Sequence, residues 1–190
     1  MKKKLITAGV DEVGRGCLAG PVISAAVIFK DSINLKLLRD SKKISFNKRE
    51  KISEHIKRNS YYAIGLASVD EILNLNILQA TLLSMKRAIE KLSIKPNLTL
   101  IDGTFAPKGL KNYKTIINGD EKIKVISAAS IIAKVYRDRL MIRLSEKFSN
   151  YAWDRNFGYG TRAHLQGLKK FGVTLHHRKK FKPVYKILSS

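Results

Sequence analysis

The sequence predicts an α/β fold in which a mixed five-stranded sheet is flanked by helices and followed by a C-terminal helical extension. Three observations predict it. Apolar segments of strand length recur before residue 120, longer segments with helical spacing lie between and after them, and the composition becomes turn-rich and aromatic from about residue 150. Strands and helices in such an order form one sheet whose faces the helices cover.

Five segments have the apolar content and the flanking turn residues of β-strands, namely 5–11, 22–29, 61–69, 98–102 and 114–117. The connection EVGRGCLAGP between the first two is too short for the crossover that parallel strands need, so this pair should be antiparallel. The third strand should extend the same meander. The order of all the elements implies a mixed sheet rather than an all-parallel one.

Three segments have the spacing of amphipathic helices: 46–59, 70–92 and 125–148. Ser68 and Asp70 are the candidate N-terminal caps of the second helix. In the third helix, the positions with core spacing are Ile126, Ala129, Ala133, Tyr136 and Leu140.

The last part of the chain reads differently from the rest. The stretch NYAWDRNFGYGTRAH is rich in aromatic and turn-forming residues, and a short helix and the basic stretch HHRKKFK follow it. Since no low-complexity linker intervenes, we expect a core of residues 1–149 and an extension of residues 150–190 that packs on it. The basic stretch is suited to non-specific electrostatic contact with a nucleic-acid duplex.

The net charge points to a polyanionic partner. The chain of 190 residues has 37 Lys and Arg against 15 Asp and Glu, a formal charge of +22. Such an excess favours nucleic acid as the partner. Compositional drift of surface residues toward Lys would produce the same excess, and the two explanations are compatible. Charge alone does not separate DNA from RNA, or binding from catalysis.

Cysteine content and hydropathy favour a reducing compartment. Cys17 is the only cysteine, which excludes an intramolecular disulfide, and it is expected to be a small buried residue rather than a nucleophile. The apolar stretch from Leu5 to Val10 is short for a secretory signal, and no apolar run approaches the ~20 residues of a membrane span. We expect a soluble, cytoplasmic monomer that does not bind membranes.

Four acidic residues lie at the ends of predicted elements: Asp11 and Glu12 after the first strand, Asp102 after the fourth, and Asp120 before the last helix. Adjacent residues of a regular strand point to opposite faces, so Asp11 and Glu12 serve one site only if the strand ends or bends there. Gly14 and the glycine two residues on allow such a bend. Taken singly, each of these two acids is better explained by a structural role than by catalysis, Asp120 as a helix cap and Asp102 as part of an ordinary turn.

Several carboxylates that converge in a basic protein suggest hard divalent cations with oxygen ligands. On a phosphodiester substrate, two such ions about 4 Å apart activate water and stabilise the leaving oxygen. The basic surface would then gather the polyanion, and the clustered acids would hold the metals that cut it.

The sequence resembles the ribonuclease HII (type 2 ribonuclease H) family in six motifs. DEVGRGCLAGPV resembles the family's DEAGRG opening with its AGPV, RDSKKIS resembles its DSKKLS element, and LIDG supplies the third acid. GD with VISAASIIAKVYRDRLM resembles the fourth acid and its helix, FGYGTRAH the GYGT-x-x-H element, and GVTLHHRKKFKPV the C-terminal ending. The motifs run in order over nearly the whole chain. Val13, Phe157 and Lys180 are small departures from them.

This resemblance implies a ribonuclease H-like fold and an endonuclease that requires Mg²⁺ or Mn²⁺, with two ions when substrate is bound. It implies cleavage of the RNA strand of RNA–DNA hybrids and on the 5′ side of single ribonucleotides in duplex DNA. The ends would be 3′-OH and 5′-phosphate, as in ribonucleotide removal and primer processing. Asp11, Glu12, Asp102 and Asp120 would be the catalytic metal-binding acids, with Asp120 acting directly or through water.

Two further elements are candidates for recognising the ribonucleotide. The 2′-OH distinguishes RNA from DNA locally. Gly14 and Gly16 let the backbone approach a sugar closely, and Arg15 between them can hold a phosphate; alternatively, the glycines only form the hairpin bend. Tyr159 resembles the family's tyrosine that packs against the sugar beside the scissile junction; alternatively, it is an aromatic anchor of the extension. His164 should support the Tyr159 loop.

The candidate phosphate contacts are Lys42, Lys43, Ser127, Ser130 and Lys134. The two in DSKKIS rest mainly on the resemblance, and as solvated lysines they would be ordinary. The other three form one stripe of helix 125–148 that begins beside Asp120. Asp138 lies four residues after Lys134, and we interpret it as an ion-pair partner of that lysine rather than as a metal ligand.

Two other functions compete with this one. A non-catalytic RNA- or ribosome-binding protein would bind without metal and tolerate Asp11→Asn or Asp102→Asn. A metal-dependent nuclease for another substrate, such as DNA junctions, would cut all-DNA duplexes and ignore the 2′-OH. The spaced acids disfavour the first alternative, and the Gly-Arg-Gly and Tyr159 elements disfavour the second.

Overall fold

The computed structural model describes residues 5–30 and 45–189. Its centre is a five-stranded sheet in the order β3-β2-β1-β4-β5. The strands are β1 (Thr7–Val13), β2 (Val22–Phe29), β3 (Ser60–Ala67), β4 (Leu98–Asp102) and β5 (Tyr113–Ile116). β1, β2 and β3 form the antiparallel meander, while β4 pairs in parallel with both β1 and β5. The predicted mixed sheet is confirmed.

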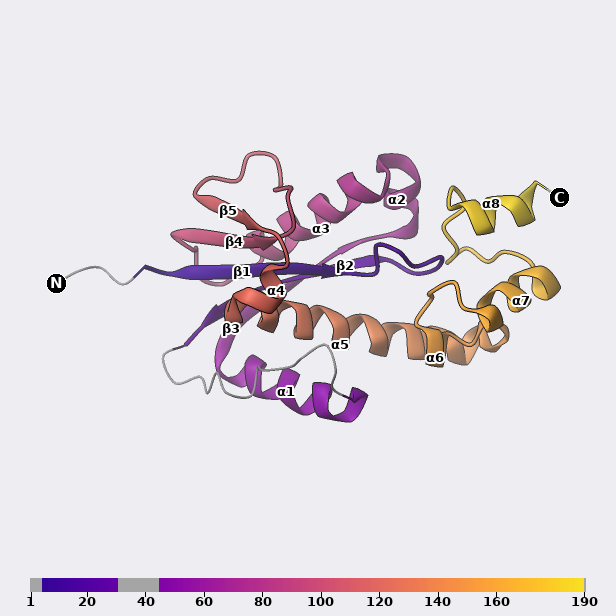
Figure 1. Cartoon of the computed structure of the whole chain (residues 1–190), viewed down its shortest axis with the longest axis horizontal. Coiled ribbons are helices and arrows are strands. Elements are labelled where there is room, and N and C mark those ends of the chain that lie inside the picture. The colour runs from indigo at the N-terminus through magenta and orange to yellow at the C-terminus, as the bar shows by residue number, and fades with distance from the viewer. Residues whose placement is uncertain (1–4, 31–44, 190) are drawn as a thin grey trace.

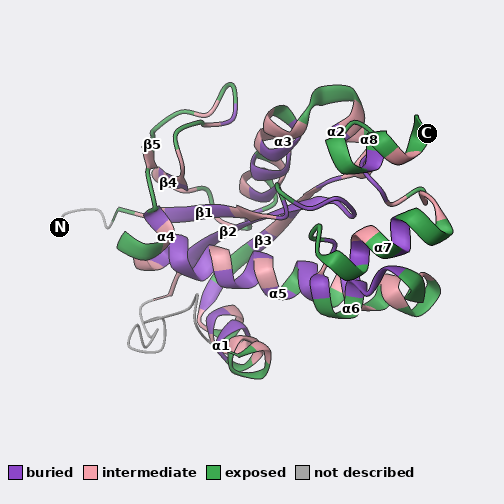
Figure 2. Ribbon diagram, turned by 45° about the vertical axis from the view of Figure 1, so that its right-hand side comes forward, coloured by how far each residue is buried: buried purple, intermediate pink, exposed green. Residues whose placement is uncertain are grey.

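Helices cover both faces of this sheet (Figure 1). On one face lie α1 (Phe46–Arg58) and the long α5 (Lys124–Lys147), and on the other α2 (Val69–Leu75) and α3 (Ile77–Glu90). β2 shows the alternation: Ala25 packs in the α1–α5 cluster, whereas Ala26 packs in the α3 cluster. Because both of its faces are covered, β2 is apolar along nearly its whole length (VISAAVIF). Figure 2 shows it buried at the centre.

α5 lies unusually close to β1. A Cβ on Gly9 would overlap the backbone of Val125, so only glycine at this strand position lets the first turn of the helix touch the sheet. The start of α5, next to the short helix α4 (Gly119–Lys122), is therefore held beside the strand that carries Asp11 and Glu12.

The prediction of one continuous helix over 70–92 is wrong. Asn76 separates α2 from α3 with φ of 71°, a left-handed value, and its side chain accepts the backbone N–H groups of Leu78 and Gln79. Asparagine tolerates this conformation and caps the helix that follows, so it ends one helix and starts another. Ser68 is confirmed as the cap of α2, in a capping box with Glu71.

The core spacing predicted within α5 holds only for its first half. Ile126 and Ala133 are buried, but Tyr136 is 38 % exposed, while Arg137 and Asp138 next to it are buried. The helix packs on the sheet at its start and against the C-terminal extension further on, so the buried side rotates along its length. A single apolar stripe cannot describe a helix with two different partners.

The extension packs on the core. It contains a 3₁₀ turn (Ser149–Tyr151), α6 (Trp153–Asn156), α7 (Arg162–Phe171) and α8 (Lys182–Leu188). Trp153 is fully buried in a cluster with Met141 of α5 and with Leu18 and Ala19 of the loop after β1. Ala19 also forms an isolated antiparallel bridge with His177. Within the described ranges, no helix has both the length and the apolar content needed to cross a membrane.

Candidate active site

Three of the predicted acids meet at one edge of the sheet. β1 and β4 are parallel neighbours, so their carboxyl ends lie side by side. Asp11 and Glu12 lie near the end of β1, and Asp102 is the last residue of β4. Each offers one carboxylate oxygen to a group in which all three oxygens lie within 4.8 Å of one another. The topology of the sheet thus brings together residues that are about ninety positions apart.

Contrary to expectation, β1 does not end at Asp11. The strand continues to Val13, with Asp11 opposite Ala25 and Glu12 opposite Ser24 of β2. The Asp11 carboxylate instead turns toward its neighbour, because its Oδ1 accepts the Glu12 backbone N–H at 2.7 Å. Asp11 and Glu12, although adjacent in a strand, thus both offer a carboxylate oxygen to the same cluster.

Asp120 lies outside the cluster of three but is attached to it through the backbone. The Gly119 N–H donates to Asp102 Oδ1 at 2.6 Å, and the Asp120 N–H approaches the same oxygen at 3.4 Å. The first turn of α4 therefore rests on the Asp102 carboxylate, which ties the fourth acid to the end of β4.

Burial and mutual repulsion disfavour the charged forms of the clustered carboxylates. Asp11 is only 5 % exposed, and burial raises the pKa of its carboxyl well above the usual value, as do the charges of Glu12 and Asp102. A hydrogen bond with Ser130 opposes this rise. Burial also raises the pKa of Glu12, and Arg15 opposes it by donating to Glu12 Oε1 at 3.3 Å. Crowded, oxygen-only acidic ligands are what a hard divalent cation binds, so the residues present fit such an ion.

The Gly-Arg-Gly segment adjoins the acids. Its first glycine is packed against another side chain, whereas the second has open space where a side chain would be. Gly14 has φ of 94°, and a Cβ there would overlap the guanidinium of Arg137. Gly16, by contrast, would place a Cβ with no atom within 4 Å. The Arg15 side chain is about half exposed. The segment therefore presents the Gly16 backbone and the Arg15 side chain to solvent beside the acidic cluster.

Tyr159 lies against this same segment. It is 39 % exposed, and its hydroxyl hydrogen-bonds the buried thiol of Cys17, directly after Gly16. Gly158 has φ of 85°, and a Cβ there would meet the Ala19 carbonyl oxygen at 2.6 Å. The loop that carries Tyr159 is thus pressed onto the loop after β1, and the two predicted recognition elements are brought together.

His164 supports the Tyr159 loop as expected. Its Nδ1 lies 2.9 Å from the Tyr159 carbonyl oxygen, and its Nε2 lies 3.1 Å from the Trp153 indole nitrogen and 3.0 Å from His177 Nε2. Because the residue is fully buried in this network, it is not placed to act as a base on a substrate.

The residues predicted to contact phosphate lie in different surroundings. The Lys134 ammonium pairs with buried Asp138 at 2.8 Å, which confirms the predicted ion pair. It also lies over the rings of Phe157 (4.8 Å) and Tyr159 (5.7 Å). Ser130 bonds Asp11 rather than standing free, and Ser127 is buried. Lys42 and Lys43 lie outside the described residues.

The predicted duplex contact through HHRKKFK is wrong for two of its residues. His177 and Arg178 are buried, and only the lysines that follow are exposed. Arg137, which the sequence pattern does not single out, is fully buried against Gly14. Nothing in the local pattern marks either arginine as buried, because arginine is normally a surface residue.

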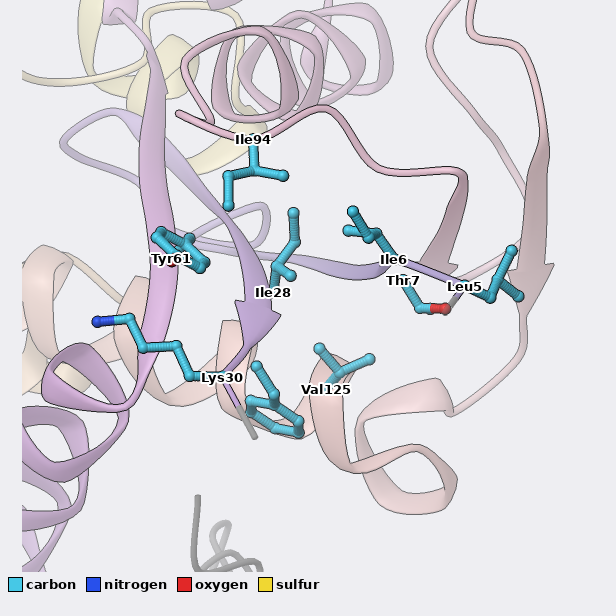
Figure 3. A pocket seen from close by; sticks show the side chains of 9 residues that line it. Leu5, Ile6, Thr7, Ile28, Lys30, Tyr61, Ile94 and Val125 are labelled. Carbon is cyan, nitrogen blue, oxygen red and sulfur yellow. The ribbon is translucent and has the colours of Figure 1, made fainter. Parts of the chain in front are cut away.

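A separate pocket of about 490 Å³ lies at the other end of β1 (Figure 3). Leu5, Ile28, Tyr61, Ile94 and Val125 are among its mostly apolar lining residues. None of the four acids lines it. The pocket is therefore separate from the acidic site.

The comparisons with known proteins agree with this geometry. The family description Ribonuclease HII matches residues 8–185. Ribonuclease HII of Pelagibacter ubique is 58 % identical over 96 % of this chain and 99 % of its own length. That of Macrococcus caseolyticus is 49 % identical over 97 % of this chain and 70 % of its own. The crystal structure of ribonuclease H2 from Pyrococcus horikoshii superimposes with a TM-score of 0.79 at 27 % identity, covering 97 % of this chain and 98 % of that one. The sheet order, the acid cluster and these similarities together show that the chain belongs to the ribonuclease HII family and is a ribonuclease H-type hydrolase.

Proposed function

We propose that the chain is a divalent-metal-dependent endonuclease that hydrolyses the RNA strand of RNA–DNA hybrids. We propose further that it cuts on the 5′ side of a single ribonucleotide embedded in duplex DNA. The observation that carries the proposal is the cluster of three carboxylates at the β1–β4 edge, with the open Gly16 backbone and Tyr159 beside it. The family name supports the substrate class.

Asp11, Glu12 and Asp102 would hold the metal, with Asp120 on the anchored turn of α4 as the fourth acid. A divalent ion at such a site lowers the pKa of water and stabilises negative charge on phosphoryl oxygens. Either Mn²⁺ or Mg²⁺ suits an all-oxygen donor set. The raised pKa of Asp11, caused by burial and by its acidic neighbours, supports this assignment, since a cation would relieve the repulsion.

The cut proposed here makes the 2′-OH a recognised group rather than a reacting one. Water attacks phosphorus, the P–O3′ bond breaks, and the released 3′ oxygen takes up a proton, which leaves 3′-OH and 5′-phosphate ends. The ribonucleotide stays on the downstream fragment with its 2′-OH intact. Attack by that 2′-OH would break the bond on the ribonucleotide's other side, so its cut position distinguishes the two chemistries.

The remaining residues would bind and orient the substrate. The backbone at Gly16 is open enough to hydrogen-bond the 2′-OH, and the exposed Arg15 can contact a phosphate while it remains near Glu12. Tyr159 would pack its ring against the adjacent sugar. The exposed lysines of residues 150–190 would bind the duplex non-specifically, which is the role we propose for the extension.

Cleavage of an end-labelled duplex containing one ribonucleotide tests the proposal. The assay compares Mg²⁺, Mn²⁺ and chelator, with an all-DNA duplex as the substrate control and Asp11→Asn as the protein control. We expect metal-dependent cutting on the 5′ side of the ribonucleotide that Asp11→Asn abolishes. Binding without cutting would favour the non-catalytic alternative, and equal cutting of the all-DNA duplex would refute recognition of the 2′-OH.

A further inference from the structure

Two arginines are buried next to the Gly-Arg-Gly segment without a described acidic partner. Arg137 of α5 is fully buried and Arg178 is 1 % exposed. Within residues 5–30 and 45–189, neither forms an ion pair with a carboxylate. Burial lowers the pKa of Arg178 to about 10, which still leaves it protonated at neutral pH. Buried charges are unfavourable unless they are fully hydrogen-bonded, so the partners of these two need explanation.

Their partners are backbone carbonyls of two loops. Arg137 donates from Nε to the Pro21 carbonyl (3.0 Å), from Nη2 to that of Ala19 (2.9 Å), and from Nη1 to that of Phe157 (2.7 Å). The first two belong to the loop after β1, and the third precedes Gly158 and Tyr159. One guanidinium therefore joins the two loops directly.

Arg178 also bonds the loop after β1. Its Nε donates to the Gly20 carbonyl at 2.9 Å and its Nη1 to the Arg15 carbonyl at 2.8 Å. Its own backbone N–H donates to the Leu18 carbonyl at 2.8 Å. The Arg15 carbonyl lies in the middle of the Gly-Arg-Gly segment, so the C-terminal extension reaches into the proposed recognition element.

We propose that Arg137 and Arg178 are positioning residues that fix the Gly14–Gly16 backbone relative to the Tyr159 ring and so set the preference for a single embedded ribonucleotide. This inference rests on the proposed function. Neither guanidinium is exposed enough to touch substrate. A continuous hybrid offers a 2′-OH at every position of the RNA strand, whereas an embedded ribonucleotide offers one, so only the latter depends strictly on this spacing.

The chemistry requires arginine at both positions. A planar guanidinium presents donors in a fixed fork that spans several carbonyls at once, whereas a lysine ammonium is a point charge on a flexible stem. A lysine ammonium would not hold the separated carbonyls in the same fixed geometry, so the loops would be freer to shift relative to each other. A misplacement of about 1 Å suffices to lower a rate by about a hundredfold.

The test compares Arg137→Lys and Arg178→Lys with wild type on two substrates, a duplex with one ribonucleotide and a continuous RNA–DNA hybrid. Arg87→Lys is the matched control, because Arg87 also donates to a backbone carbonyl, that of Leu66, and pairs with Glu71 outside the two loops. kcat and KM are measured with saturating Mn²⁺, well below each variant's unfolding midpoint. We expect kcat on the single-ribonucleotide duplex to fall about tenfold or more relative to kcat on the hybrid, with KM little changed.

The outcomes separate this inference from the proposed function. If wild type does not cut the single-ribonucleotide duplex, the proposed function itself fails. If wild type cuts it but the variants lose activity on both substrates by the same factor, or Arg87→Lys shifts the ratio equally, the arginines are merely structural. If a lysine variant does not fold, Arg178→Gln, which removes the buried charge, should show the same shift in ratio. Failure of all three variants to fold would also overturn the inference.

Discussion

The backbone N–H of Gly119 donates to Asp102 Oδ1 at 2.6 Å, so the turn that carries Asp120 is fastened to the strand end that carries the third acid. This bond links β4, which belongs to the sheet, with α4, which lies outside it. Asp120 thereby stays beside the cluster of Asp11, Glu12 and Asp102 without belonging to it. Substitution of Asp11 should therefore affect the cluster directly, whereas substitution of Asp120 should not.

Asp11→Asn should stabilise the metal-free protein while abolishing cleavage. Because burial and the neighbouring acids raise the pKa of Asp11, its charge at neutral pH opposes folding. An uncharged amide removes that opposition and should raise the unfolding free energy by about 1 kcal/mol or more, or about 2–4 °C in Tm. Thermal unfolding in chelator measures it. Added Mn²⁺ should raise the Tm of wild type and of Asp120→Asn, but much less that of Asp11→Asn. A lower Tm of Asp11→Asn in chelator would contradict the assigned repulsion.

Tyr159→Ala should lower kcat on a single-ribonucleotide duplex by about tenfold or more, while the affinity for all-DNA duplex changes little. Tyr159→Phe keeps the ring that lies beside the Lys134 ammonium and loses only the hydroxyl at Cys17, so it should retain most activity. Tyr185→Ala, which removes another exposed tyrosine of the extension, is the control. If Tyr159→Ala lowered the affinity for all-DNA duplex by the same factor as kcat on the single-ribonucleotide duplex, the ring would only anchor the extension.

Gly14→Ala should destabilise the protein more than Gly109→Ala. Both glycines have positive φ, 94° and 83°, so both substitutions introduce backbone strain of about 1–2 kcal/mol. Only at Gly14 does the new Cβ overlap Arg137, whose guanidinium is held by three hydrogen bonds, which should add about 1–3 kcal/mol. Chemical denaturation of both variants measures the difference. Similar losses would show that Arg137 can move away.

The folded protein should lose stability as the pH falls below about 6.5. Burial lowers the pKa of His177 to about 3 and also lowers those of His164 and His176. Between these values and the unfolded pKa of about 6.5, the unfolded chain binds protons that the folded chain does not, so the unfolding free energy decreases. Each such histidine contributes up to about 1.4 kcal/mol per pH unit. The slope should be smaller in His177→Gln; an unchanged slope would show that His177 does not contribute.

Lys134→Met should destabilise the protein by about 2–3 kcal/mol, because it removes the 2.8 Å partner of the buried Asp138 carboxylate. The double variant Lys134→Met/Asp138→Asn should recover part of this loss, since the buried carboxylate becomes an uncharged amide, while Arg49 loses its 3.7 Å ion pair with Asp138. Cleavage by the double variant then separates two roles of Lys134. A raised KM of the double variant would support contact between Lys134 and a phosphate. Kinetics equal to those of the wild type would show that the lysine serves only the ion pair.

The sequence predicted the strands well because their apolar runs are bounded by glycine and other turn residues. The antiparallel β1–β2 pair followed from a connection too short for a crossover, and the acids were noticeable because they lie near the ends of apolar segments. Local patterns failed where a residue's role depended on its neighbours in space. Asn76 divides a helix whose spacing looks continuous, and Tyr136 is exposed where α5 changes partners.

By itself, the sequence determined the mixed sheet and most of the order of the elements, and it singled out the four acids as candidates, since these depend on local periodicity and on residue types at element ends. The tertiary structure decided which of these acids share a cluster, because only the parallel β1–β4 pairing brings Asp102 to Asp11 and Glu12. It also decided the burial of Arg137 and Arg178. Most of their hydrogen bonds reach carbonyls of the loop after β1, more than a hundred residues away, and no local pattern records a contact made at that separation.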